Sequence, residues 1–185
     1  MRKMACCAVI LALTWPLATA DAQPSADVQV LPSTGRVRPA DTVDGAGSVS
    51  IAAARNEVES FQVVITAHGG TLTYVKTEMT PLRHEDYAIP AENIRLFRAE
   101  SVPIRRVGFR ATEGPGLVPD PLIPFENPYT GETLGRPVWR REEGKMLPGR
   151  FGGTDFSVWD GQNQIVWVDV AVPKDAPAGV YAGVL

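Results

Sequence analysis

Short apolar segments alternate with turn-forming residues along most of the chain. The segments are rich in Val, Ile, Thr and aromatic residues, and Gly or Pro separates them, which is the pattern of β-strands. They cover residues 28–31, 48–53, 60–67, 71–79, 94–99, 102–109, 164–172 and 179–185. No stretch keeps a helical period over three turns. The pattern therefore predicts an all-β fold, a β-sandwich of antiparallel sheets of the immunoglobulin-like or jelly-roll-like kind.

Two segments carry the clearest strand patterns. Segment 164–172 has apolar residues on both of its faces, so we expect it to be a central strand. The turn formers at 173–179 predict that residues 180–185 return beside it as a hairpin with a long turn. Gly69 and Gly70 predict a turn after segment 60–67. Alternate positions of that segment predict one buried face, formed by Phe61, Val63, Ile65 and Ala67.

A proline-rich stretch interrupts the strand pattern. Residues 114–150 contain seven prolines, which excludes a central strand because proline has no N–H for the ladder. The stretch also carries apolar residues and is too long for an ordinary connection. We expect an ordered, extended loop excursion from the sandwich.

The first residues predict a targeting signal. Arg2 and Lys3 precede an apolar run that is shorter than the ~20 residues needed to cross a bilayer, and small residues follow near Ala20. Residues 1–20 are therefore interpreted as a cleaved signal peptide of a secreted or periplasmic protein with no membrane partner. We expect a short linker at 21–26 and the sandwich at 27–185. The strand pattern runs up to Leu185, so we also expect the sandwich to be cut short there.

Composition narrows the class of protein. The chain has 185 residues, which suits one domain. Both cysteines, Cys6 and Cys7, lie in the signal, so the mature chain is expected to have neither a disulfide nor a cysteine metal site. Loss of Arg2 and Lys3 leaves 16 of the 18 basic residues against 21 acidic ones, a net charge of −5. That charge argues against a nucleic-acid partner.

Residue types that carry catalysis are present without a catalytic pattern. Glu57 and Glu59 would point to one side of a strand, but Glu57 follows Arg55 and is interpreted as a structural ion pair or loop hydrogen bond. Glu142 and Glu143 follow two arginines and are interpreted as a solvated charge run. The sequence has no nucleophile elbow and no phosphate-binding glycine loop. We predict no catalytic residue and no cofactor in this chain.

Metal ligands are likewise scattered. His68 and His84 are interpreted as solvated turn residues, because neither has a second ligand at metal spacing. Loop oxygens that could bind calcium follow no calcium-loop pattern, and we predict no metal site. These loop residues are Asp120, Glu126, Asn127, Asp155 and Asp160.

Four aromatic residues are candidates for contact with sugars or with another domain. Aromatic rings stack on sugar rings when they are exposed, and they pack against a neighbouring domain when they are not. The candidates are Trp139, Trp159, Tyr129 and Phe151.

Four segments, in this order, resemble the N-terminal β-sandwich of glycoside hydrolase family 123 and of related uncharacterised secreted proteins. They are residues 52–64, 118–124, 161–170 and 172–181, and the resemblance extends over about 28–185. Their most recognisable parts are Arg55-Asn56-Glu57, Val118-Pro119-Asp120-Pro121, Gln162-Asn163-Gln164 and Val172-Pro173-Lys174-Asp175.

The resemblance implies a (β/α) barrel that follows the sandwich in the same polypeptide. In the family an adjacent Asp-Glu pair of that barrel hydrolyses N-acetylgalactosaminides with help from the substrate's acetamido group. The barrel lies outside these residues, so the chain is expected to be a non-catalytic N-terminal accessory module. Its expected partners are that C-terminal catalytic barrel and, secondly, glycans.

The matched motifs are expected to have structural roles. Arg55, Asn56 and Glu57 would fix the start of the strand that contains Phe61. Asp120 would hold a rigid turn by side-chain hydrogen bonds to the backbone, and Asn163 would lie in the turn that starts the strand of Trp167. The proline-rich excursion, with Trp139 and Trp159, is the candidate surface for the barrel. Two alternatives remain open: a stand-alone carbohydrate-binding module, and an immunoglobulin-like structural or adhesive domain.

Overall fold

A five-stranded antiparallel sheet forms the body of the fold. The computed structural model describes residues 23–110, 114–134, 139–140, 145–146 and 152–185. The strand order in the sheet is β1-β2-β11-β6-β7, so β11 is central, as the two apolar faces of its sequence predicted. The strands are β1 (Ser25–Pro32), β2 (Val58–His68), β11 (Asn163–Ala171), β6 (Ile94–Ile104) and β7 (Gly116–Pro124).

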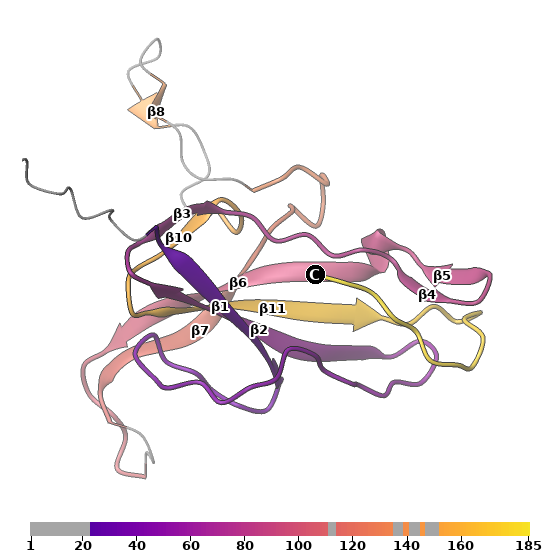
Figure 1. Cartoon of the computed structure of the whole chain (residues 1–185), viewed down its shortest axis with the longest axis horizontal. Coiled ribbons are helices and arrows are strands. Elements are labelled where there is room, and N and C mark those ends of the chain that lie inside the picture. The colour runs from indigo at the N-terminus through magenta and orange to yellow at the C-terminus, as the bar shows by residue number, and fades with distance from the viewer. Residues whose placement is uncertain (1–22, 111–113, 135–138, 141–144, 147–151) are drawn as a thin grey trace, which may run out of the picture.

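Three two-stranded pairs accompany this sheet. They are β3 (Leu72–Val75) with β10 (Phe156–Val158), β4 (Leu82–His84) with β5 (Tyr87–Ile89), and β8 (Trp139–Arg140) with β9 (Lys145–Met146). A single 3-10 turn, η1 (Ala91–Asn93), leads into β6. In Figure 1 the β3–β10 pair lies toward one end of the five-stranded sheet and the β4–β5 pair toward the other. The fold is all-β and antiparallel, which confirms the predicted class.

Side chains on both faces of the main sheet are buried. The larger core lies between this sheet and the short pairs, and it takes in the predicted face of β2 together with even-numbered residues of β11. A smaller core lies on the opposite face, where residues 31–43 cover Val64 and Ile165. The larger core consists of Phe61, Val63, Ile65, Ala67, Ile94, Phe125, Phe156, Val158, Val166, Val168 and Val170.

Several predicted strands have different bounds in the structure. Residues 94–99 and part of 102–109 form one strand, β6, which continues across a bulge at residues 99–101. Segment 71–79 is a strand only at Leu72–Val75, where Tyr74 has a φ of 58° and the pairing with β10 shifts. β1 begins at Ser25, inside the predicted linker 21–26. The turn at Gly69 and Gly70 is present, and both glycines have positive φ.

The predicted hairpin between β11 and residues 180–185 is wrong. β2 and β6 occupy both edges of β11, so no edge is left for a returning strand. The chain after β11 instead crosses to the other layer, where Ala182 pairs with Arg83 of β4. Residues 48–53 were also predicted to be a strand, but this prediction is wrong, because they have no ladder partner among the described residues.

The proline-rich stretch begins with a strand rather than a loop. β7 contains Pro119, Pro121 and Pro124 and lies at the edge of the main sheet, where it pairs with β6 alone. An edge strand needs ladder bonds on one side only, which is why it tolerates prolines. The stretch was therefore correctly excluded from the sheet centre, but not all of it is an excursion. Within the described residues no helix has the length and apolar character required to cross a bilayer.

Candidate functional site

The start of β2 is held by a closed turn of the Arg55-Asn56-Glu57 motif. The Glu57 carboxylate accepts the Ala54 amide at 2.6 Å, and the Glu57 amide donates to the Ala54 carbonyl at 3.3 Å. Asn56 has a φ of 61°, in the left-handed region that Asn tolerates better than most residues, and its amide donates to the Val172 carbonyl at 2.9 Å. The Glu57 carboxylate is thus engaged with the backbone of its own turn.

Arg55 joins this turn to the segment that follows β11. Its Nε atom donates to the carbonyl of Ala176 at 2.6 Å, and Ala176 is buried. The two segments on either side, residues 47–55 and 176–185, therefore share an anchored end near Arg55.

An apolar groove lies between these two segments. We define the apolar groove by its floor, formed by Val28, Val30, Phe61 and Val63, and by its two walls, residues 47–55 and 176–185. Its volume is about 960 Å³. Val28 is 48% exposed although it lies in the floor. The groove could not be predicted from the sequence, because the hydrophobic pattern of each segment was consistent with a fully paired strand.

The 176–185 wall is held against β4 and β5 by ring contacts. His84 Nδ1 lies 3.1 Å from the Val180 carbonyl oxygen and donates to it, and its ring centroid lies 5.2 Å from that of Tyr181. Gly179 allows this approach, since a Cβ atom there would fall on the His84 imidazole. His84 is half-buried and engaged in these contacts, so its interpretation as a solvated turn residue is wrong, whereas His68 is exposed at the end of β2.

Tyr87 completes this ring cluster. Its ring meets that of Tyr181 edge-on at 6.1 Å, and its hydroxyl donates to Asp175 Oδ1 at 3.4 Å. Desolvation raises the pKa of the Tyr87 phenol above its ordinary value of 10.0, and the neighbouring Asp175 carboxylate raises this pKa further.

Asn163 fastens the loop after β1 to the central strands. Its Nδ2 atom donates to the carbonyls of Arg38 at 3.0 Å and Asp41 at 2.7 Å, while its Oδ1 atom accepts the Thr66 hydroxyl at 2.7 Å. Its own amide donates to the Pro39 carbonyl at 2.8 Å. Asn163 is buried and is the first residue of β11. The motif Gln162-Asn163-Gln164 was expected in the turn before this strand, and Asn163 directly follows that turn.

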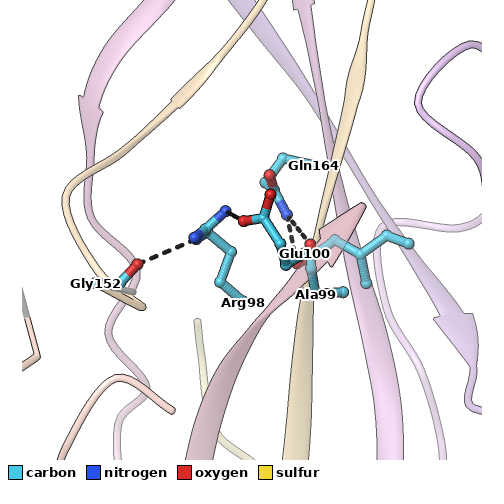
Figure 2. A network of polar contacts seen from close by, with 6 residues as sticks. Arg98, Ala99, Glu100, Gly152 and Gln164 are labelled. Carbon is cyan, nitrogen blue, oxygen red and sulfur yellow. Dashed lines mark hydrogen bonds and ion pairs between the residues drawn. The ribbon is translucent and has the colours of Figure 1, made fainter. Parts of the chain in front are cut away.

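A polar network fixes the base of the proline-rich excursion. Arg98 forms an ion pair with Glu100 and donates from Nε to the Gly152 carbonyl at 3.2 Å. Gln164 Nε2 donates to the Ala99 carbonyl at 2.8 Å, and Figure 2 shows these side chains close together around the middle of β6. The network connects β6 and β11 to the segment that leads into β10.

The predicted aromatic residues are exposed where they can be described. Trp159, directly after β10, is 64% exposed, and Tyr129, in the loop after β7, is 94% exposed. No ring contact joins them in the described part of the chain. Phe151 lies outside the described residues, and so do the side chain of Trp139 and the pair Glu142 and Glu143.

Asp120 does not form the predicted turn. It is exposed within β7, at a bulge where Asp120 and Pro121 together lie opposite Glu100 of β6, so the strand continues past Pro119 and Pro121 instead of turning. Its carboxylate makes no hydrogen bond with the described residues, so the expected side-chain bond to the backbone is wrong.

Acidic side chains are dispersed over the described surface. Asp160 Oδ1 accepts the Gly70 amide at 3.0 Å, from a segment 90 residues away along the chain, and Asn127 Oδ1 accepts the Tyr129 amide at 2.9 Å within its own turn. Asp155 lies 3.7 Å from the ammonium group of Lys76. Among the described residues, no three His, Cys, Asp or Glu side chains gather closely enough to hold a metal ion.

Comparison with known proteins finds a similar fold in part of a solved structure. No protein-family model matches the sequence, and no curated protein matches it. The solved structure of a family 123 glycoside hydrolase from Clostridium perfringens, which was analysed for glycolipid glycan hydrolysis, matches with a TM-score of 0.57 and 11% sequence identity. The match covers 86% of this chain and 23% of that chain. The chain therefore shares its fold with a part of a family 123 glycoside hydrolase and spans less than a quarter of that protein's length.

Proposed function

We propose that this chain is a non-catalytic accessory β-sandwich module of an exported glycoside hydrolase-like protein, placed N-terminal to its catalytic barrel. One observation carries the proposal. The fold matches most of this chain but only 23% of the family 123 enzyme, as expected if the chain corresponds to one domain of such a protein. The resemblance of the motifs to the N-terminal sandwich of the family supports the same placement, with β-N-acetylgalactosaminidase-type activity in the barrel.

In this role the module supports the barrel and shapes the approach of substrate to it. The proline-rich excursion is our candidate for the contact with the barrel. Its base is fixed to the main sheet by the bond from Arg98 to Gly152 and by the bond from the Gly153 amide to the Leu134 carbonyl, at 2.8 Å. A surface that is fixed to the main sheet in this way can hold the barrel in a defined orientation relative to the sandwich. Residues 1–20 serve as the signal for export.

The test combines a mass with an activity. An antibody against this chain recovers the native protein from its source, and its intact mass is compared with that of residues 21–185. We expect a mass far above that of these residues, hydrolysis of a p-nitrophenyl N-acetyl-β-galactosaminide by the longer protein, and no hydrolysis by the isolated chain. A native mass equal to that of residues 21–185, or turnover by the isolated chain, would overturn the proposal.

A second candidate function is carbohydrate binding by the module itself. The observation that favours it is the 64% exposure of Trp159, directly after β10. Titration with amino-sugar oligosaccharides should then quench tryptophan fluorescence in the wild type but not in Trp159→Ala. Unchanged fluorescence at millimolar glycan would exclude this function.

A further inference from the structure

The apolar groove has a polypeptide backbone with unused hydrogen-bonding groups along each wall. In the 176–185 wall, the amide and carbonyl of Ala182 pair with Arg83 at 3.0 and 2.8 Å, and the Val184 carbonyl accepts the Thr80 amide at 2.9 Å. In an extended chain, successive residues direct these groups to opposite sides. Tyr181 and Gly183, which alternate with them, make no backbone hydrogen bond with any described residue. This wall is therefore paired on its β4 side only.

The opposite wall has the burial pattern of a strand but no partner. Val49 and Ile51 are half-buried and pack on the larger core, while Ser48 and Ser50 are exposed. Residues 47–53 make no backbone–backbone hydrogen bond with the described residues. In Figure 1 this segment (purple) and the C-terminal segment (yellow) run along opposite sides of β2 and β11. Two segments with unpaired backbone groups thus flank one apolar floor.

The second layer leaves part of the floor uncovered, since Val28 is 48% exposed and Val30 is half-buried, whereas Phe61 and Val63 are buried. Over the rest of the larger core, Leu72 and Val75 of β3 and Leu82 of β4 pack against the main sheet. Over Val28 and Val30 the second layer is interrupted by the groove. A groove with an apolar floor and two open strand edges suits an added strand, since its backbone pairs with the edges and its alternate side chains fill the floor.

We propose that the apolar groove accepts one extended strand with apolar residues at alternating positions, supplied by the polypeptide that follows Leu185 in the longer protein. This inference rests on the proposed function for the existence of that polypeptide. Leu185 itself lines the groove, so a chain continuing from it starts beside the floor. A short turn would bring the strand back along the open side of Tyr181 and Gly183. The second layer of the sandwich would then be continuous.

The experiment extends the chain by a designed strand. Residues 21–185 are fused to Asn-Gly-Val-Thr-Val-Thr-Val-Thr, in which Asn-Gly supplies the turn and Val, opposite Leu185, Gly183 and Tyr181, supplies the apolar face. The matched control replaces the first and second Val of the strand by Pro, which removes two backbone donors. We expect the fusion to raise Tm by about 4 °C or more, to lower the fluorescence of bound anilinonaphthalene sulfonate severalfold, and to slow amide exchange at Gly183 about tenfold. The proline control should reproduce the unfused chain.

A variant of the floor tests the position of the strand. Val28→Glu places a charge at a half-exposed position, so the unfused variant should fold with a similar Tm. In the fused chain this substitution should abolish the gain in Tm and the slower exchange at Gly183. A fusion that behaves like its proline control would overturn the proposal. Stabilisation by the free octapeptide but not by the fusion would also overturn it, because the strand would then come from another chain.

These outcomes are separate from those of the proposed function. The fusion experiment reports on the groove alone and involves no glycoside. A native mass equal to that of residues 21–185 would overturn the accessory-module function even if the fused strand binds. An active longer protein whose groove rejects the strand would overturn only this inference.

Discussion

Trp167 donates its indole N–H to Oδ1 of Asp169, two residues further along the same strand, at 2.7 Å. The same oxygen accepts the hydroxyl of Ser60 from the neighbouring strand at 2.6 Å. The two bonds connect a half-buried face of β11 to β2, and one carboxylate oxygen serves both. A polar side chain therefore organises this part of the sheet, within a strand for which the sequence analysis predicted only two apolar faces.

Replacing Asp169 by Ala should remove both bonds and leave the Trp167 and Ser60 donors unpaired at a half-buried position. Unsatisfied donors cost about 1–3 kcal/mol when buried, so we expect a loss of about 1–2 kcal/mol in the free energy of unfolding. Urea unfolding followed by circular dichroism measures this loss. Asp169→Asn keeps the accepting oxygen and should recover most of it. Equal stability of the Ala and Asn variants would contradict this role for the oxygen.

Asn163→Ala should loosen the loop that covers the smaller core. The substitution removes two donated bonds to carbonyls and one accepted bond, and we expect a loss of about 2–4 kcal/mol in the free energy of unfolding. The control is Gln162→Ala. The Gln162 side chain makes no hydrogen bond in the described part of the chain, so this substitution should lower the free energy of unfolding by less than about 0.5 kcal/mol. Hydrogen exchange should also become faster at the Ala46 amide, which donates to β1 within the same loop. Similar losses in both variants would argue against the Asn163 bonds.

The hydrophobic periodicity of the sequence predicted most of the segments that form strands of the main sheet and some of the side chains that are buried in them. The side chains predicted to be buried at alternating positions from Phe61 to Ala67 are buried, but Gln62 and Val64 on the other face of β2 are buried as well, which the alternation did not predict. Such a pattern does not show which residues a side chain will contact in the fold. The partners of Asn163 at Arg38 and Asp41 lie 125 and 122 residues away along the chain. The same limit explains the error at residues 180–185, whose apolar pattern does not say that both edges of β11 are already occupied.

Gly179→Ala should displace the C-terminal segment from β4. The new methyl group would fall on the His84 imidazole, which its bond to Val180 and its contact with Tyr181 hold in place. Overpacking of this kind costs about 1–3 kcal/mol. Faster amide exchange at Ala182 and Arg83 would locate the effect. Gly47→Ala is the matched control, because nothing lies within 4 Å of the added methyl group and φ is not positive, so its stability should be unchanged or slightly higher.

Stability should fall at alkaline pH through Tyr87. The folded state raises the pKa of this phenol and so favours its neutral form, whereas the unfolded chain ionises it near its ordinary pKa of 10.0. The contribution of Tyr87 is therefore complete below about pH 10 and is lost as the pH rises through the folded-state pKa. Comparing Tm from pH 8 to 11 for the wild type and Tyr87→Phe tests this, and the variant should lose less Tm above pH 10. Tyr129→Phe, at a 94% exposed ring, should follow the wild type.

The prolines of β7 also affect how this protein behaves at high concentration. Three of the nine residues in this outermost strand bring no N–H, so its free side offers an interrupted row of donors to any approaching chain. Exposed strand edges are the usual templates for edge-to-edge aggregation, and proline is one of the residues that blocks them. The main sheet is thereby protected from growing outward at β7, and a concentrated solution of the protein should resist fibril formation along that edge.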